Sequence, residues 1–351
     1  MTKGRQVRAV LGFVLTGTLA VVLTACGSSG GSASTTTTAA AAQPSTTTTS
    51  TPPAQGLNLA SPGASSGCPS PACTDVLSLV SAAPKITALP SDLQPSLLNA
   101  QNDLLRPTDA KCQPISQIQS GAACTYNYSS NPSAPMMVLL GDSHAWMWAT
   151  SLAEVAHRTG YNFTMIYHSS CRMPLIAFAD SPGTTNAQCV QWKQSVFDWI
   201  SQANPNLIVV ATQDAGPIDQ HGNSISQSTY NAGLVAMLDK VSAPGRRVVL
   251  LGDIPVLSQD GPTCLAANES AVQNCSSPTD TAVRSRTQEG QSSAAAQAGA
   301  AYIYTIPWLC TTSVCPAVIG NYEVYQDKYH ITSTYGNYLS NVLQSALGLV
   351  G

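Results

Sequence analysis

From residue 135 onward, short apolar runs alternate along the chain with longer amphipathic stretches. The runs are rich in Val, Ile and Leu and lie at or within residues 136–141, 161–167, 207–212, 246–255 and 301–307. They do not alternate with polar residues, which is typical of strands buried on both faces. Strands that alternate with helices form a parallel sheet with right-handed crossovers. The sequence therefore predicts a three-layer α/β/α sandwich around a five-stranded parallel sheet.

The stretches between the runs predict the helices. They cover residues 144–159, 189–203, 229–242, 280–298 and 332–347. Gly160 follows the first of them and is a favourable residue just beyond a helix end. We interpret residues 131–351 as one α/β domain and residues 58–130, which contain the helical sequence SDLQPSLLNAQNDLL, as an N-terminal extension packed on it.

The first 26 residues are typical of a bacterial lipoprotein signal. Three basic residues precede the apolar stretch 9–22, and LTAC follows at 23–26. The apolar stretch is too short and wrongly flanked for a stable membrane span. We expect residues 1–25 to be removed and Cys26 to be lipidated, which would anchor the exported protein to the outer face of the cytoplasmic membrane. An ordinary secretory signal with a chance cysteine is the alternative.

Residues 26–57 would then form a lipidated cysteine and a tether. Beyond Cys26 this segment consists of small and polar residues, has no charge and has little to bury. It cannot offset its own ordering entropy, so we expect a flexible linker that lets the domain reach away from the membrane.

The cysteines agree with export. Of 11 cysteines, ten remain beyond Cys26, and an even number outside the cell predicts disulfides. Nearest-neighbour pairing is the simplest arrangement, although the sequence alone leaves the connectivity open. It gives Cys68–Cys73, Cys112–Cys124, Cys171–Cys189, Cys264–Cys275 and Cys310–Cys315. A zinc site is disfavoured because the chain has no Cys-x-x-Cys pair and no histidine pair at ligand spacing, and we predict no metal and no cofactor.

Charge makes nucleic acid an improbable partner class. Residues 1–25 hold three of the 15 basic residues and none of the 18 acidic ones, so the remaining chain has 12 against 18 and a net charge of −6. It has no basic cluster of the kind that binds phosphate backbones.

Polar residues follow three of the predicted strands at their carboxyl ends. They are Gly141-Asp142-Ser143, Thr212-Gln213-Asp214 and Gly252-Asp253. Ligands of open parallel sheets bind at this edge. We therefore predict a substrate cleft there, with Trp146, Asp214 and Asp253 among its residues. Of the sequence Trp146-Met147-Trp148, one or two side chains should face the core instead.

Ser143 is placed to act as a nucleophile. It follows a buried strand at the predicted start of a helix, where unpaired backbone N–H groups can stabilise an oxyanion. A serine hydroxyl needs a base and the base needs an orienting partner. Among the five histidines (His144, His157, His168, His221 and His330), His330 fits best, because Asp327 precedes it by three residues. His144 is adjacent to Ser143, and adjacent side chains at a helix start do not face each other.

The motifs VLLGDSH (138–144) and DKYH (327–330) resemble the SGNH hydrolase superfamily. More narrowly, they resemble the SGNH domain fused to bacterial acyltransferase-3 membrane proteins, which O-acetylate polysaccharides. The segment LPSDLQPSLLNAQNDL resembles the one that precedes that domain, and SSCRMPL and PWLCTTSVCPAVIGNYEVYQDKYHIT resemble its cysteine-bearing motifs. The resemblance implies a flavodoxin-like fold and a triad of Ser143, His330 and Asp327. We expect a standalone form in which the lipid anchor takes the place of the membrane acyltransferase.

The resemblance is weaker at the oxyanion hole. The superfamily often has a Gly in its second sequence block and an Asn in its third, where this chain has Ser169-Ser170 and Gln213-Asp214. The backbone N–H of Ser143, the side chain of Gln213 and Ser170 are therefore the predicted donors.

Three functions remain open from the sequence. The first is an exported O-acyl transferase, with acetyl as the expected acyl group, that acts on a cell-envelope glycan and receives its acyl group from a membrane protein. The second is an O-acetyl esterase of the same glycans. The third is a non-catalytic lipoprotein that binds glycan, since a fold alone does not establish activity.

Overall fold

The computed structural model describes residues 70–104, 110–115, 122–179, 183, 186–214 and 216–350 of the 351-residue chain. The predicted signal, the predicted lipidation site Cys26, the predicted tether and Cys68 lie outside the described residues. Within the described ranges, no helix is long and apolar enough to cross a membrane.

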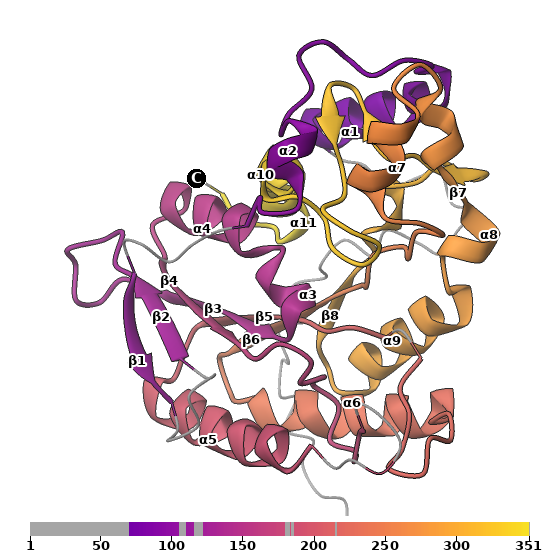
Figure 1. Ribbon diagram of the computed structural model, residues 1–351. Coiled ribbons are helices and arrows are strands. Elements are labelled where there is room, and N and C mark those ends of the chain that lie inside the picture. Colours follow the sequence, from indigo (N-terminus) through magenta and orange to yellow (C-terminus); the bar gives the residue numbers. More distant parts are fainter. Residues whose placement is uncertain are drawn as a thin grey trace, which may run out of the picture. The chain divides into compact units, whose positions relative to one another are not determined.

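A seven-stranded sheet with the order β1-β2-β4-β3-β5-β6-β8 forms the centre of residues 70–350 (Figure 1). Five strands pair in parallel: β3 (Met136–Gly141), β4 (Asn162–Tyr167), β5 (Leu207–Ala211), β6 (Arg247–Leu251) and β8 (Ala301–Ile303). Each coincides with a predicted run, which confirms the five-stranded parallel sheet.

Two antiparallel strands extend that sheet beyond the prediction. The strands β1 (Lys111–Pro114) and β2 (Ala122–Tyr126) form a pair, and β2 pairs with the edge of β4. Both come from the segment interpreted as an N-terminal extension. The sheet therefore has seven strands rather than five, because the exposed edge of β4 is covered by strands from that segment.

Helices cover both faces of the sheet, as the predicted sandwich requires (Figure 1). On one side, α6 (Gln227–Val241) packs against α5 (Ala187–Ala203) and α9 (Ser285–Gln297). On the other side, α4 (Ala149–Arg158) contacts α10 (Ser333–Tyr338) and α11 (Ser340–Ala346), and α11 also contacts α1 (Pro71–Ala82).

Short elements complete the described residues, and three helices that were predicted as continuous are divided. The helix predicted at 332–347 is α10 followed by α11. The helix predicted at 144–159 is α3 (Ser143–Trp146) followed by α4, and the one predicted at 280–298 is α8 (Thr279–Ala282) followed by α9. The remaining elements are α2 (Leu97–Ala100), α7 (Gly261–Ala267), η1 (Ala83–Lys85), η2 (Val272–Cys275), η3 (Ile306–Trp308), β7 (Ser277–Pro278), β9 (Val314–Cys315), β10 (Val318–Ile319) and β11 (Tyr322–Glu323).

The last residue of β3 must be glycine. A Cβ on Gly141 would lie 1.8 Å from the backbone oxygen of Ala211 and 2.7 Å from the Cβ of Ala145. Gly141 pairs with Ala211 across β3 and β5, and the chain turns into α3 directly after it. The absence of a side chain thus lets the strand end pack against both its neighbour and the next helix.

Four disulfides join described cysteines: Cys112–Cys124, Cys171–Cys189, Cys264–Cys275 and Cys310–Cys315. They are the pairs that nearest-neighbour pairing predicts. Cys73 is also disulfide-bonded, while its predicted partner Cys68 lies outside the described residues.

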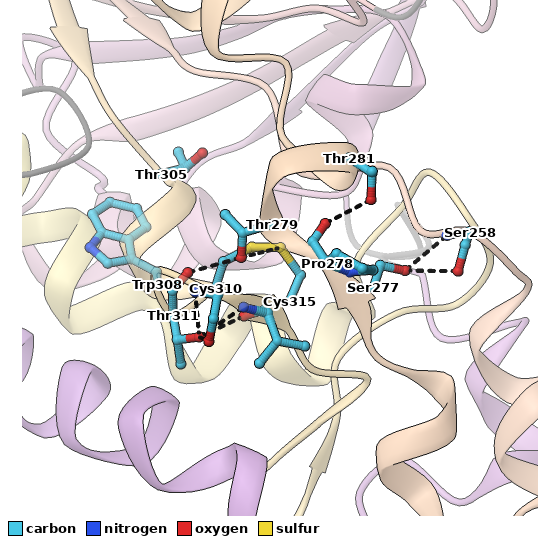
Figure 2. The surroundings of a disulfide bond; sticks show 12 residues. Ser258, Ser277, Pro278, Thr279, Thr281, Thr305, Trp308, Cys310, Thr311 and Cys315 are labelled. Atoms are coloured by element: carbon cyan, nitrogen blue, oxygen red, sulfur yellow. Dashed lines mark hydrogen bonds between the residues drawn. A yellow bond between two sulfur atoms is a disulfide. The ribbon is translucent and has the colours of Figure 1, made fainter.

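Figure 2 shows how one disulfide is embedded. The Cys310–Cys315 bridge closes a short loop, and the hydroxyl of Thr279 donates a hydrogen bond of 3.0 Å to the backbone oxygen of Thr311 within that loop. The backbone of Ser277 pairs with that of Cys315. The loop is therefore fastened to the start of α8, upstream of the segment that carries Asp327 and His330.

Glu323, at the end of β11, is fully buried. Neither carboxylate oxygen has a hydrogen-bond partner among the described residues. Burial, followed by the nearby charges of Asp260 and Asp103, raises the pKa of Glu323 to about 8. The folded chain therefore holds a proton there that the unfolded chain releases near pH 4.5.

The Glu323→Gln variant should gain stability over the wild type as the pH rises. Below pH 4.5 the carboxyl is protonated in both states, and between 4.5 and about 8 only the folded state keeps the proton, so wild-type stability falls across this window. Urea unfolding with intact disulfides should show a relative gain of about 1–3 kcal/mol at pH 9 over pH 4. The exposed Glu269→Gln is the control, and an equal effect at both pH values would contradict the prediction.

Candidate active site

The serine of the GDSH sequence lies where β3 turns into α3. Asp142 is the N-cap of α3, and its carboxylate Oδ1 accepts the backbone N–H of His144 at 2.8 Å. Its other oxygen, Oδ2, accepts the hydroxyl of Thr212 and the backbone N–H of Gln213, both at 2.9 Å. Asp142 thereby ties the end of β5 to the turn and holds the half-buried Ser143 at the carboxyl edge of the sheet.

The loop before α10 brings His330 to that serine. The Nε2 of His330 lies 2.9 Å from the Oγ of Ser143, and its Nδ1 lies 2.8 Å from Oδ2 of Asp327. The other oxygen of Asp327 accepts the backbone N–H groups of Tyr329 at 2.6 Å and His330 at 2.8 Å. These backbone bonds hold the Asp-x-x-His turn in the conformation that directs the ring toward Ser143.

The electrostatics suit a carboxylate that orients an imidazole. Burial raises the pKa of Asp327, but the hydrogen bond and charge of His330 and the two backbone N–H groups outweigh it, and the pKa lies below its ordinary 3.8. Asp327 is therefore ionised at neutral pH and accepts Nδ1–H of His330, which leaves Nε2 to accept the proton of Ser143. A hydroxyl, an imidazole and a carboxylate in this order can activate the serine as a nucleophile.

Two of the predicted oxyanion donors lie together. Ser170 and Gln213 both line a cavity of about 330 Å³. Ser170 has a positive φ of 63°, and the side-chain oxygen of Gln213 accepts a hydrogen bond of 3.0 Å from Arg172. This bond holds the side-chain amide of Gln213 at the cavity. The role of that amide as an oxyanion donor stays a prediction.

Two of the predicted cleft residues are buried. Asp214 and Asp253 are only 4% and 6% exposed. The carboxylate of Asp253 bonds with His144 Nδ1 at 2.5 Å and accepts the backbone N–H groups of Asp214 and Ile254 at 2.9 Å. Asp253 is therefore an internal partner of His144, and its role in a substrate cleft stays a prediction. The side chain of Asp214 is likewise removed from the surface.

Two of the three large side chains at residues 146–148 face the core, as expected. Met147 and Trp148 are buried, whereas Trp146 is half-buried and stacks on Tyr167 with ring centroids 5.0 Å apart. Tyr167 ends β4 beside Gly141. Tyr167 is not among the residues predicted for this edge of the sheet, although a large aromatic at the end of a predicted strand is a signal that could have identified it.

Of the other four histidines, His144 contacts His330, and the backbone N–H of His168 donates to the backbone oxygen of Gly141 at 3.1 Å. His157 contacts Tyr128, His168 contacts the ring of Trp192, and His221 lies in an exposed turn. The ring of His144 is 5.1 Å from that of His330. The sequence does not predict the contact of His144 with His330, because it shows only that the side chain of His144 does not face Ser143. The part of the chain that the structure describes holds no group of three potential metal ligands.

A serine at the start of a helix, bonded to a histidine and an aspartate at the carboxyl edge of a parallel sheet, is the arrangement of serine hydrolases and acyltransferases with a three-layer α/β fold. The sequence matches the family described as "SGNH domain (fused to AT3 domains)" over residues 109–345. Because this match covers more than half of the chain, the protein belongs to that family.

One solved structure with similarity to the chain is described as the periplasmic domain of a lipopolysaccharide acetyltransferase from Salmonella ser. Paratyphi A. It is 15% identical, with a TM-score of 0.48, and the alignment covers 61% of this chain and 84% of that one. None of the curated proteins compared matches the chain.

Proposed function

We propose that the protein is an exported, serine-dependent O-acyl transferase that acts on a cell-envelope glycan, with acetyl as the acyl group. The observation that carries the proposal is the hydrogen-bonded series Ser143–His330–Asp327, with distances of 2.9 and 2.8 Å. Family membership supports it, since the family's SGNH domains occur fused to AT3 domains.

The reaction would proceed in two steps. The Oγ of Ser143 attacks the acyl carbonyl while His330 Nε2 takes the hydroxyl proton, and the donor alkoxide leaves with that proton as the tetrahedral intermediate collapses. A glycan hydroxyl then attacks the acyl-enzyme, gives its proton to His330 and receives the acyl group as Ser143 regains its proton. Asp327 stabilises the imidazolium in both steps.

Backbone N–H of Ser143 at the start of α3, with Gln213 and Ser170, is the proposed oxyanion site. Water in place of the sugar hydroxyl would give an esterase with the same residues. We favour transfer, because the family's fusion to AT3 domains supplies a reason for an acyl group to arrive from a membrane protein. In this proposal Cys26 carries the lipid anchor, residues 26–57 form the tether, and a separate membrane protein is the partner that supplies the acyl group.

The first test is labelling of the purified full chain with a fluorophosphonate, followed by intact mass spectrometry. An activated Ser143 should form one adduct, and Ser143→Ala should form none, because fluorophosphonates react with serines that have a general base in contact. Ser81→Ala, an exposed serine on α1, is the matched control and should label as the wild type does. An unlabelled wild type that is folded by circular dichroism would contradict the proposal.

A second measurement separates transfer from hydrolysis. Labelled acetyl from 4-nitrophenyl acetate should appear on an added polysaccharide acceptor in the wild type and not in Ser143→Ala. Release as free acetate alone, with every acceptor tested, would assign the protein as an esterase.

A further inference from the structure

We propose that His144, held by Asp253 beside the triad, is a positioning residue that carries a positive charge and opposes the protonation of His330. The inference concerns the buried charges themselves, and it rests on the proposed function only for its kinetic test.

The contacts of Asp253 favour a negative charge on its carboxylate. Its Oδ1 meets His144 Nδ1 at 2.5 Å and the N–H of Ile254 at 2.9 Å, and its Oδ2 accepts the N–H of Asp214 at 2.9 Å. Both backbone partners can only donate, so the carboxylate serves as an acceptor. A carboxylate that is 6% exposed needs a counter-charge, and His144, itself 1% exposed, is the titratable group in contact with it.

The other charges around His144 act in the same direction. Burial lowers the pKa of His144, but Asp253, Asp142 and Asp327 outweigh it and leave the pKa above its ordinary 6.5. Burial likewise raises the pKa of Asp253, and the charge and hydrogen bond of His144 bring it below 3.8. Five further titratable groups surround the pair: Asp142, His330, Asp327, Asp214 and Lys193. Burial, followed by the charge of Asp253, raises the pKa of Asp214 to about 8. Lys193 interacts electrostatically with Asp142.

The geometry favours an effect of charge over a proton relay. The rings of His144 and His330 are 5.1 Å apart and inclined by 59°. The second nitrogen of His144, Nε2, is buried and has no hydrogen-bond partner among the described residues, so the described contacts provide no path for a proton to His330. The hydrogen bonds of Asp253 go to His144 and to backbone groups rather than to His330. His330 is therefore exposed to the positive charge of the His144 ring without sharing a proton with it.

The kinetic test follows the rate of fluorophosphonate labelling from pH 5 to 9 in the full chain. In His144→Asn the side chain can still donate to Asp253 but has no charge, and the uncompensated carboxylate should favour protonation of His330. The midpoint of the acid limb should rise by about one pH unit, the size expected for a unit charge some 5 Å away in a partly shielded site. His157→Asn, which removes an exposed histidine, should leave the midpoint unchanged.

The double variant His144→Asn/Asp253→Asn separates charge from structure. Removing both charges should return the midpoint to near the wild-type value, even if the plateau rate stays lower. A structural role for His144 would instead lower the rate by the same factor at every pH and leave the midpoint where it was. That result in the single variant would overturn the inference.

A measurement on the wild type covers variants that fail to fold. In ¹⁵N-histidine-labelled protein, both ring nitrogens of His144 should keep imidazolium shifts above pH 6.5, the ordinary pKa of a histidine. An unprotonated Nε2 on His144 at pH 7 would overturn the inference. These resonances do not depend on turnover. A wild type that does not react with the fluorophosphonate would therefore count against the proposed function alone.

Discussion

Replacing His330 by glutamine should slow the turnover of 4-nitrophenyl acetate by roughly 10³–10⁴-fold at pH 8. The variant removes the base that lies 2.9 Å from the Oγ of Ser143, and the hydroxyl then has no acceptor for its proton in the attack. The residual rate should equal that of Ser143→Ala, and the His330→Gln/Ser143→Ala double variant should be no slower than either single one, because the two residues act as a unit.

The matched control is His157→Gln, on the exposed side of α4. It should retain wild-type turnover. A loss of less than tenfold in folded His330→Gln, or a double variant much slower than both single ones, would mean that Ser143 and His330 do not work as one nucleophile. The measurement needs only initial rates of nitrophenolate release, corrected for the spontaneous reaction.

Replacing Trp148 by alanine should lower the free energy of unfolding by about 3–5 kcal/mol. Trp148 precedes α4, is fully buried and meets the ring of Trp308 edge-on, with centroids 6.3 Å apart and an angle of 75° between the rings. Removing an indole from this contact leaves a cavity that rigid neighbours such as the sheet cannot fill. Urea unfolding monitored by circular dichroism, with the disulfides oxidised, measures the change.

Trp199→Ala provides the comparison, since Trp199 lies on α5 and is only partly buried. Its loss should cost clearly less than that of Trp148. Equal losses of stability from the two substitutions would show that burial does not explain the contribution of Trp148 to the free energy of unfolding.

The position of Ser143 was predictable because two short-range signals coincide. The run MMVLLG is apolar without alternation, and Gly-Asp-Ser breaks it at once, so strand, turn and helix start follow from local composition. The Asp-x-x-His turn is similarly local, because Asp327 binds the backbone N–H of the very histidine that it orients. Both features depend on residues that are neighbours in the chain, so the sequence alone was sufficient to predict them.

The boundaries and edges of the fold were less predictable. The strands β1 and β2 are short, and the burial of β1 is slight, so they carry no apolar run that distinguishes them from a loop. They become strands because the edge of β4 offers unpaired backbone groups. The division of α3 from α4 falls at Met147 and Trp148, which are both buried, and the helical pattern of the sequence does not mark it.

By itself, the sequence of this protein determined the parallel sheet, the nearest-neighbour cysteine pairs as the simplest arrangement, and the proposed serine, histidine and aspartate. The sheet depends on a repeated pattern of apolar runs, the cysteine pairs and the Asp-x-x-His turn on residues near one another in the chain, and the pairing of Ser143 with His330 on a family resemblance. Tertiary structure alone decided that Asp253 faces inward to His144, 109 residues away, and that the ring of His144 meets His330. The physical reason is that a charge pair depends on the distance between two atoms, and only the order of strands in the sheet brings those atoms together.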